Sequence, residues 1–117
     1  MKRLYLVMIN TLRGLAHGVQ SEAALREEAI VLAIALPVGI WVAPSIGWYV
    51  AMIGALLALL AVELLNTAVE KLADHVTREQ HPQIGRIKDF GSAAVFCAIC
   101  LAGLVWLAAL GLRLNLL

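Results

Sequence analysis

Charged residues are scarce in this sequence, and their scarcity argues against an ordinary soluble domain. Only 15% of the 117 residues are charged and 62% are hydrophobic, whereas soluble domains carry about 25% charged residues. Aromatic residues make up 6% of the chain, and no basic stripe alternates with them. We therefore expect no nucleic-acid partner. The length suits one domain, residues 1–117, and the composition predicts a small integral membrane protein.

Cysteine is rare as well. The two cysteines, Cys97 and Cys100, form a CxxC pattern inside an apolar run. A redox pair needs access to water, and a zinc site needs further ligands nearby. We therefore expect both thiols to pack in the apolar core rather than to carry chemistry.

The first 28 residues are amphipathic, unlike the sequence that follows. Within residues 1–20, apolar side chains such as Tyr5 and Met8 fall on one helical face, and polar ones such as Arg13 fall on another. This periodicity predicts a helix that lies along the membrane interface. A short polar segment then leads into apolar sequence.

Three apolar segments predict three membrane-spanning helices. The 34 residues from Ala29 to Val62 carry no formal charge, more than the about 20 residues that one span needs but fewer than two spans need. A turn at Pro44 and Ser45 divides them, so spans are expected at about 29–42 and 46–74, the second continuing beyond the membrane. After a loop predicted over 75–86, a run of 23 uncharged residues predicts the third span at about 90–112.

The positive charges predict how these spans are oriented. They gather before the first span and between the second and third, whereas residues 43–48 have none; these cations are Lys2, Arg3, Arg13, Arg26, Lys71, Arg78, Arg86 and Lys88. Cytoplasmic loops carry an excess of lysine and arginine. We therefore expect the N-terminus and the long loop in the cytoplasm, and the C-terminus outside.

A line of acidic residues lies on the second predicted span. At about 100° per residue, Glu70 and Asp74 lie within roughly 20° of Glu63 on a helix, and Asn66 and Thr67 flank the same line. Glu63 falls near the cytoplasmic edge of the hydrocarbon, where ionisable groups are costly and usually mark function. The pattern indicates a site that could hold a divalent metal between carboxylates and use one carboxylate as a base.

Two further polar groups reach the same membrane face in this topology. They are residues 22–28, before the first span, and residues 88–92, at the start of the third. Interhelical salt bridges on a solvated helix face are the alternative interpretation. That alternative explains Asp74 and Lys71 well. It explains Glu63 and Asn66 poorly, because apolar residues flank them at membrane depth.

Three motifs resemble those of the prokaryotic diacylglycerol kinase family. The pattern E-[LIV]-x-N-[ST]-A-[LIV]-E is matched by residues 63–70, E-A-A-x-R-x-E by residues 22–28, and G-R-x-K-D-x-G-S-A-A-V by residues 85–95. The motifs stand in register, and the resemblance covers about residues 10–112. It implies an ATP-dependent lipid kinase of a kind that has neither a P-loop nor protein-kinase motifs. This sequence has no P-loop motif either.

The resemblance also implies an assembly and a set of site residues. It implies homotrimers of three-span subunits, each with an N-terminal surface helix, whose active sites are shared between neighbours. Glu63 would be the general base for the lipid hydroxyl, and Asn66 would orient that hydroxyl. Glu22 and Glu70 would hold Mg²⁺ on the ATP phosphates, and Lys88 would compensate charge on the transferring group. Further nucleotide contacts would be Thr11, Glu79, His81 and Asp89. Further lipid contacts would be Arg3, Glu28 and Ser92, with Asp74 in support.

Two alternatives stay open at this stage. Undecaprenol kinases are a related branch, and His81-Pro82 resembles theirs, whereas residues 91–94 and 22–24 favour diacylglycerol as the lipid. A small ion or proton conduit is the alternative from another class, but a conduit should carry ionisable residues through the whole bilayer depth. Here they stop at one interface. We therefore expect an all-α kinase of the bacterial inner membrane, with ATP, Mg²⁺ and a lipid bearing a primary hydroxyl as partners.

Overall fold

The computed structural model describes residues 1–77 and 79–117, and these residues form four helices. The helices are α1 (Lys2–Ser21), α2 (Ala23–Val42), α3 (Ile46–Val76) and α4 (Pro82–Arg113). Nearly every described residue is helical, so the all-α expectation is confirmed for this part of the chain. Arg78, one of the cations counted for the orientation, lies outside the described residues.

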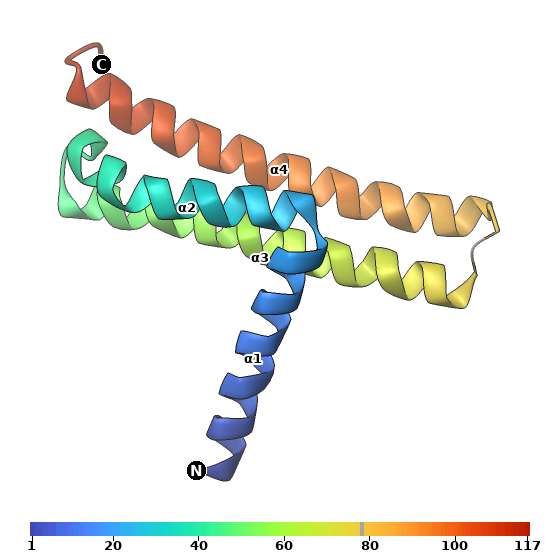
Figure 1. Ribbon diagram of the computed structural model, residues 1–117. Coiled ribbons are helices and arrows are strands. Elements are labelled where there is room, and N and C mark those ends of the chain that lie inside the picture. Colours follow the sequence, from blue (N-terminus) through green and yellow to red (C-terminus); the bar gives the residue numbers. More distant parts are fainter. Residues whose placement is uncertain (78) are drawn as a thin grey trace.

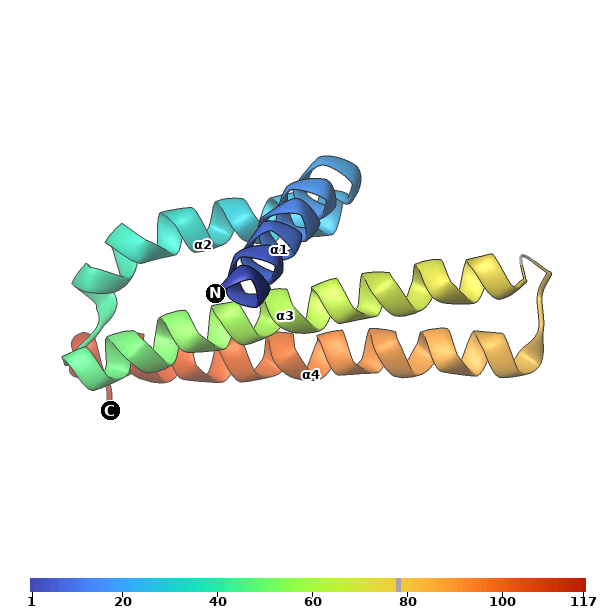
Figure 2. The ribbon, with the colours of Figure 1, turned by 90° about the horizontal axis from the view of Figure 1, so that it is seen from below.

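Helices α2, α3 and α4 run side by side, and α1 projects away from them (Figure 1). Helix α3 packs against both α4 and α2, whereas α1 contacts mainly α2. The view turned by 90° confirms that α1 points out of the bundle (Figure 2). If α3 and α4 cross a bilayer, α1 can therefore lie along its surface, which suits an amphipathic helix.

Helices α3 and α4 are, among the described residues, long and apolar enough to cross a membrane. Helix α2 has 20 residues, but three charged residues, Arg26, Glu27 and Glu28, lie near its start. Its uncharged part, residues 29–42, would be only about 21 Å long against a hydrocarbon core of about 30 Å. Length and composition thus support the spans predicted at about 46–74 and 90–112, and the span predicted at about 29–42 depends on α2.

The connection between α3 and α4 is shorter than the loop predicted over 75–86, because α3 ends at Val76 and α4 begins at Pro82. Proline suits the first turn of a helix, where its missing N–H would have no partner anyway. His81 caps the same turn, since its Nδ1 accepts a hydrogen bond from the Gln83 N–H at 3.2 Å. The polar residues after Pro82 therefore extend α4 instead of forming a loop.

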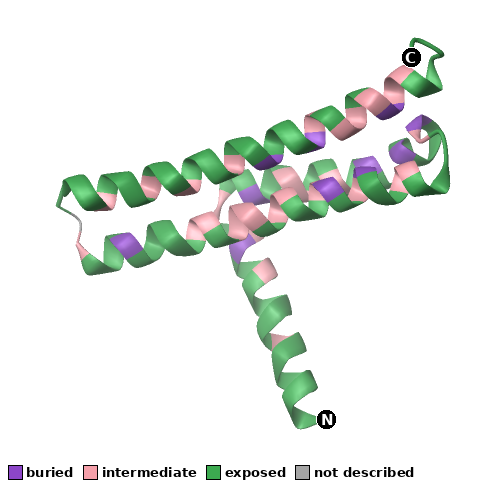
Figure 3. Cartoon of the chain, turned by 180° about the vertical axis from the view of Figure 1, so that it is seen from behind, coloured by how far each residue is buried: buried purple, intermediate pink, exposed green. Residues whose placement is uncertain are grey.

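The buried core is small and consists largely of alanine. Its members are Leu25, Ala35, Val42, Met52, Ala55, Ala73, Ala98, Ala102 and Ala109. Figure 3 shows that the buried residues are scattered along the bundle and that most other residues are exposed. Small residues at contacts let helices approach closely, which is how helices associate in membranes. Many large apolar side chains face outward, so lipid or a second copy of the chain is needed to cover them.

The two cysteines do not belong to this core. Cys97 and Cys100 are free and exposed on α4, so the expectation that they pack in the core is wrong for the single chain. Helix α4 buries Ala98 and Ala102 instead. Neighbouring positions on a helix point about 100° apart, which turns the thiols away from this contact.

Aromatic residues tie the helices together at the end of the bundle far from the α3–α4 connection. The Trp106 indole N–H donates to the Met52 carbonyl at 3.0 Å, and the Tyr49 hydroxyl donates to the Leu36 carbonyl at 2.9 Å. The first bond joins α4 to α3, and the second joins α3 to α2. Together they help to set the register in which the polar ends of the three helices meet.

Candidate functional site

The acidic line on α3 meets α2 at its membrane end. Glu63 and Glu28 are both partly buried, and their carboxyl groups are hydrogen-bond partners. Residue 28 precedes the first predicted span. Burial, followed by the neighbouring Glu63 carboxyl group, raises the pKa of Glu28 from 4.5 to about 7. Near neutral pH, Glu28 is therefore divided between its protonated and ionised forms beside a second carboxyl group.

Asn66 lies one turn further along α3 and faces α4. Its Nδ2 donates to Glu70 Oε1 at 3.2 Å. Its Oδ1 is buried without a partner and lies against Gly91 of α4, where an added Cβ would overlap it. The amide thus orients the Glu70 carboxylate, and the missing side chain at residue 91 leaves room for the amide.

Glu22 stands between α1 and α2 and reaches across to α3. Its Oε1 lies 2.8 Å from the Nζ of Lys71. Lys71 follows Glu70 directly, so the ion pair brings Glu22 to the same turn of α3 that carries Glu70. The two residues predicted to hold Mg²⁺, Glu22 and Glu70, therefore lie at the same turn of α3. Glu22 is already paired with the ammonium group of Lys71.

The water-side end of the acidic line is paired with α4. The Nζ of Lys88 lies 2.6 Å from Asp74 Oδ1, and the two side chains are 39% and 53% exposed. A pair this exposed contributes at most about 1 kcal/mol to stability. Lys88 can therefore exchange its partner for a phosphate at little cost.

Both ion pairs join different elements, as the salt-bridge alternative expects. That alternative accounts for Glu22, Lys71, Asp74 and Lys88. It does not account for the buried Asn66 Oδ1, which has no partner, or for the meeting of two carboxyl groups at Glu28 and Glu63. Buried polar atoms without partners are rare and are expected to have a functional or ligand-related reason.

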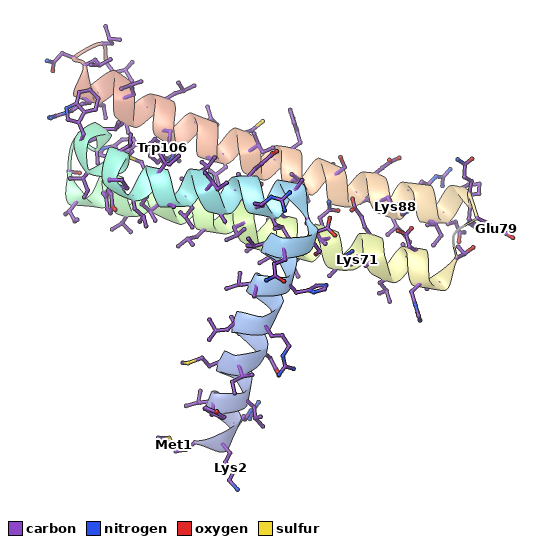
Figure 4. All side chains as sticks on the ribbon, in the orientation of Figure 1. Met1, Lys2, Lys71, Glu79, Lys88 and Trp106 are labelled. Atoms are coloured by element: carbon purple, nitrogen blue, oxygen red, sulfur yellow. The ribbon has the colours of Figure 1, made fainter. Side chains whose placement is uncertain are left out.

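A pocket of about 530 Å³ opens at the tip of the α3–α4 hairpin. It is lined by Thr77, Glu79, Gln80, His81, Pro82, Ile84, Gly85 and Lys88. Three of the predicted nucleotide contacts, Glu79, His81 and Lys88, therefore share one cavity. Figure 4 places Glu79 at the hairpin tip and Lys88 further along α4.

The other predicted contacts are spread more widely. Thr11 lines a second cleft, of about 400 Å³, whose wall on α3 includes Lys71; its hydroxyl donates to the Val7 carbonyl at 2.8 Å. Asp89 and Ser92 are exposed on α4. Arg3 lies in the first turn of α1, at the end that points away from the bundle.

Glu22 and Glu70 are the carboxylates predicted to bind Mg²⁺. The described residues contain no group of three or more His, Cys, Asp or Glu side chains that could hold a metal ion. Mg²⁺ in phosphoryl-transfer sites is usually held by only one or two carboxylates, with water and phosphates completing the shell. The Lys71 ammonium on Glu22 shows that a cation is accommodated there. The residues present therefore fit the predicted metal.

The sequence did not single out Lys71 or Gly91 as site residues. Lys71 follows Glu70 directly. The signal in the sequence was therefore a positively charged residue among the acidic residues of 63–74. Gly91 lies inside the third motif, but its close approach to Asn66 depends on how α3 and α4 pack. The pairing of Glu28 with Glu63 depends in the same way on the packing of α2 against α3.

Comparisons with known proteins agree on one family. The profile of the prokaryotic diacylglycerol kinase family matches residues 9–110. A diacylglycerol kinase of Haemophilus influenzae is 38% identical over 96 residues, which cover 82% of this chain and 81% of that protein. Its counterpart in Escherichia coli K12 is 35% identical over 94 residues, 80% and 77% of the two chains. A diacylglycerol kinase of Pseudomonas aeruginosa is 35% identical over 106 residues, 91% and 86% of the two chains.

Proposed function

The chain belongs to the prokaryotic diacylglycerol kinase family, and we propose that it transfers the γ-phosphate of ATP to the primary hydroxyl of diacylglycerol, forming phosphatidic acid. Membership in the family makes it a lipid kinase associated with the membrane. ATP as the donor, Mg²⁺ as the metal, and the roles of individual residues are our proposal. We place the reaction at the cytoplasmic face of the bacterial inner membrane.

The course of α3 is the observation that carries this proposal. Glu63 stands 17 positions after Ile46, the first residue of α3. At about 1.5 Å per residue this is about 26 Å, close to the far edge of a hydrocarbon core of about 30 Å. Asp74 lies about 16 Å further along the same helix, on the water side. One helix can therefore link a lipid hydroxyl at the interface to a soluble nucleotide.

Glu63 is the residue that we propose as general base. Its carboxylate would accept the proton of the lipid hydroxyl while the hydroxyl oxygen bonds to the γ-phosphorus. The bond from the γ-phosphorus to the bridging oxygen would break, and ADP would leave. The partial burial of Glu63 at the membrane edge supports this role, because the hydroxyl of a membrane lipid lies at that depth.

Glu22 and Glu70 are proposed to hold Mg²⁺, which would offset the negative charge of the phosphates. The hydrogen bond from Asn66 to Glu70 supports a role for Asn66 in positioning that carboxylate. Its predicted role in orienting the lipid hydroxyl stays a prediction. Lys88, with Glu79 and His81 in the hairpin pocket, would receive the nucleotide. Thr11 and Asp89 stay predicted contacts of the nucleotide, and Arg3 and Ser92 of the lipid.

We propose a homotrimer with shared active sites as the working unit. Two observations support it. Large apolar side chains are exposed on the bundle helices, among them Leu57, Leu104 and Leu107. Arg3, a predicted lipid contact, lies at the end of α1 that points away from the acidic line of its own chain, so it could serve the site of a neighbour.

The names of the relatives support diacylglycerol as the acceptor, since the proteins of Haemophilus influenzae, Escherichia coli and Pseudomonas aeruginosa are called diacylglycerol kinases. Undecaprenol presents a similar primary hydroxyl and is the second acceptor to be tested. The ion-conduit alternative gains nothing from the family, which is one of kinases.

The first experiment supplies the purified protein with Mg-ATP labelled in the γ-phosphate and with either lipid in a bilayer. We expect label to move to diacylglycerol, and to undecaprenol more slowly or not at all. Chelation of Mg²⁺ with EDTA should stop the transfer, and added Mg²⁺ should restore it. Absence of transfer to either lipid would refute the proposal, and preferred transfer to undecaprenol would change the acceptor.

Glu63→Gln tests the base in the same assay. Because general-base catalysis contributes about 10²- to 10⁴-fold, we expect kcat to fall by that range while Mg-ATP still binds. Glu27→Gln makes the same chemical change at an exposed residue of α2 and should leave kcat near that of the unaltered protein. Turnover within tenfold of normal in Glu63→Gln would mean that another group takes the proton.

A further inference from the structure

We propose that Lys71 is a built-in counter-cation of the metal site and a further nucleotide-binding residue. Its ammonium group would hold Glu22 while the metal is absent and become available to the phosphates once Glu22 binds the metal. The inference rests on the proposed function, because it takes Glu22 and Glu70 as the metal-binding carboxylates. It adds a residue that the family motifs in this sequence do not include.

The position of Lys71 is the first argument. Its Nζ is 2.8 Å from Glu22 Oε1, and its backbone follows that of Glu70. The cation therefore occupies a ligand oxygen of one proposed metal-binding carboxylate and belongs to the same helical turn as the other. Figure 4 shows Lys71 on α3 near the junction of α1 and α2.

The exposure of the pair is the second argument. The Lys71 side chain is 58% exposed and that of Glu22 is 31% exposed, and ion pairs so open to water contribute little to stability. Breaking this pair therefore costs little. A divalent ion brings twice the charge of an ammonium group, so it can replace Lys71 on Glu22 without disturbing the fold.

The charge around Lys71 is the third argument. Glu22, Glu70 and Asp74 all lie near it, whereas Lys88, a cation on α4, is paired with Asp74. An incoming nucleotide adds further negative charge. Lys71 also lines the cleft that contains Thr11, a predicted nucleotide contact, so a released ammonium group would already stand at the wall of a cavity.

The two roles of Lys71 make opposite predictions for its removal. As a competitor for Glu22, Lys71 weakens metal binding while no nucleotide is present, so Lys71→Met should bind the metal more tightly. As a phosphate partner, Lys71 strengthens nucleotide binding, so the same variant should bind the nucleotide more weakly. A salt bridge that is only structural would not produce this pair of opposite changes.

The experiment uses the full-length protein in bilayers and Mn²⁺ as the probe, followed by electron paramagnetic resonance. Without nucleotide, we expect Lys71→Met to lower the Kd of Mn²⁺ roughly two- to fivefold. With Mg²⁺ and a non-hydrolysable ATP analogue, we expect the same variant to raise the Kd of the analogue about tenfold.

Two further variants serve as controls. Lys71→Arg keeps the charge and should stay close to the unaltered protein in both titrations. Lys2→Met removes one positive charge from the far end of α1 (Figure 4) and should leave both constants unchanged, which separates a local effect from one of net charge.

Unchanged or weaker Mn²⁺ binding in Lys71→Met would refute the counter-cation role. Unchanged binding of the analogue would refute the phosphate role. Both readouts are binding constants, so they differ from a failure of the proposed function, which would be the absence of phosphate transfer by the unaltered protein.

Discussion

At the scale of single residues, the carboxyl pair Glu28 and Glu63 is the feature whose chemistry depends most on its surroundings. The Glu28 carboxyl group is hydrogen-bonded to Glu63, and its pKa is raised to about 7, first by burial and then by Glu63. In the unfolded chain Glu28 has its ordinary pKa of 4.5. As the pH rises, the folded chain therefore keeps the proton of Glu28 to a higher pH than the unfolded chain does. Stability must then depend on pH in a defined direction.

Glu28→Gln tests this dependence. Between about pH 4.5 and pH 7, unfolding releases the proton of Glu28, so the stability of the unaltered protein should fall as the pH rises through this window. Glutamine cannot titrate, so the variant should lose less stability over the same range. The measurement is the unfolding midpoint in SDS at pH 5 and at pH 8. An equal fall in both proteins would show that other groups cause it.

Gly91 is the second residue whose role comes from its neighbour. It lies against Asn66, whose other end binds Glu70. Gly91→Ala would force Asn66 to move, and overpacking of this kind costs about 1–3 kcal/mol. We expect a lower unfolding free energy in SDS titrations and a lower kcat, because Glu70 loses its orienting partner.

Gly103→Ala is the matched control on the same helix, since nothing lies within 4 Å of a Cβ added there. Alanine is the better helix former by about 1 kcal/mol, so this variant should be as stable as the unaltered protein or more so. If Gly91→Ala behaved like Gly103→Ala, the contact with Asn66 would have no consequence for the site.

At the scale of the elements, α2 and α3 differ in length and therefore in how far they can extend across a membrane. Helix α3 has 31 residues, enough to cross a bilayer and continue into water, and this length places Glu63 and Asp74 at different depths on one rod. Helix α2 has an uncharged part too short to span a bilayer fully by itself. Its polar start, residues 22–28, would therefore lie within the interface, which is where the proposed site requires Glu22 and Glu28.

The span proposed for α2 can be tested by cysteine labelling. In a chain whose Cys97 and Cys100 are replaced by alanine, Pro44→Cys places a thiol in the α2–α3 connection and leaves the cap of α3 by Ser45 intact. If α2 spans the bilayer, a membrane-impermeant maleimide should label this thiol from outside. A thiol placed by Gln20→Cys, at an exposed position of α1 just before α2, should react only in permeabilised cells. Labelling of both thiols from the same side would rule out the span.

At the scale of the whole molecule, α1 projects away from the bundle (Figure 1), and three polar groups gather at the membrane face along which it would lie. The α1–α2 junction supplies Glu22, α3 supplies the acidic line, and α4 supplies Lys88. The bundle beyond this face is held by alanine contacts and leaves its large apolar side chains exposed. Both facts suit a subunit that completes its surface, and in our proposal its active site, with further copies.

The sequence by itself determined the features that are local or periodic. Uncharged runs predicted helices for a membrane, the 100° periodicity placed Glu63, Glu70 and Asp74 on one face, and three motifs in register identified the family. Each of these signals lies within a single stretch of chain, so no knowledge of packing was needed. The loop over 75–86 was predicted too long because polarity was taken for irregular structure, although a polar segment in water can equally be helix.

Only the tertiary structure decided which polar groups are partners. Glu22 meets Lys71, Asn66 fits against Gly91, and Glu28 faces Glu63. Each pair joins residues at least 25 positions apart on elements whose register is set by small residues and aromatic hydrogen bonds elsewhere in the bundle. A shift of one residue in that register would turn a helix face by about 100° and separate every pair, which is why composition and spacing could name the groups but not their contacts.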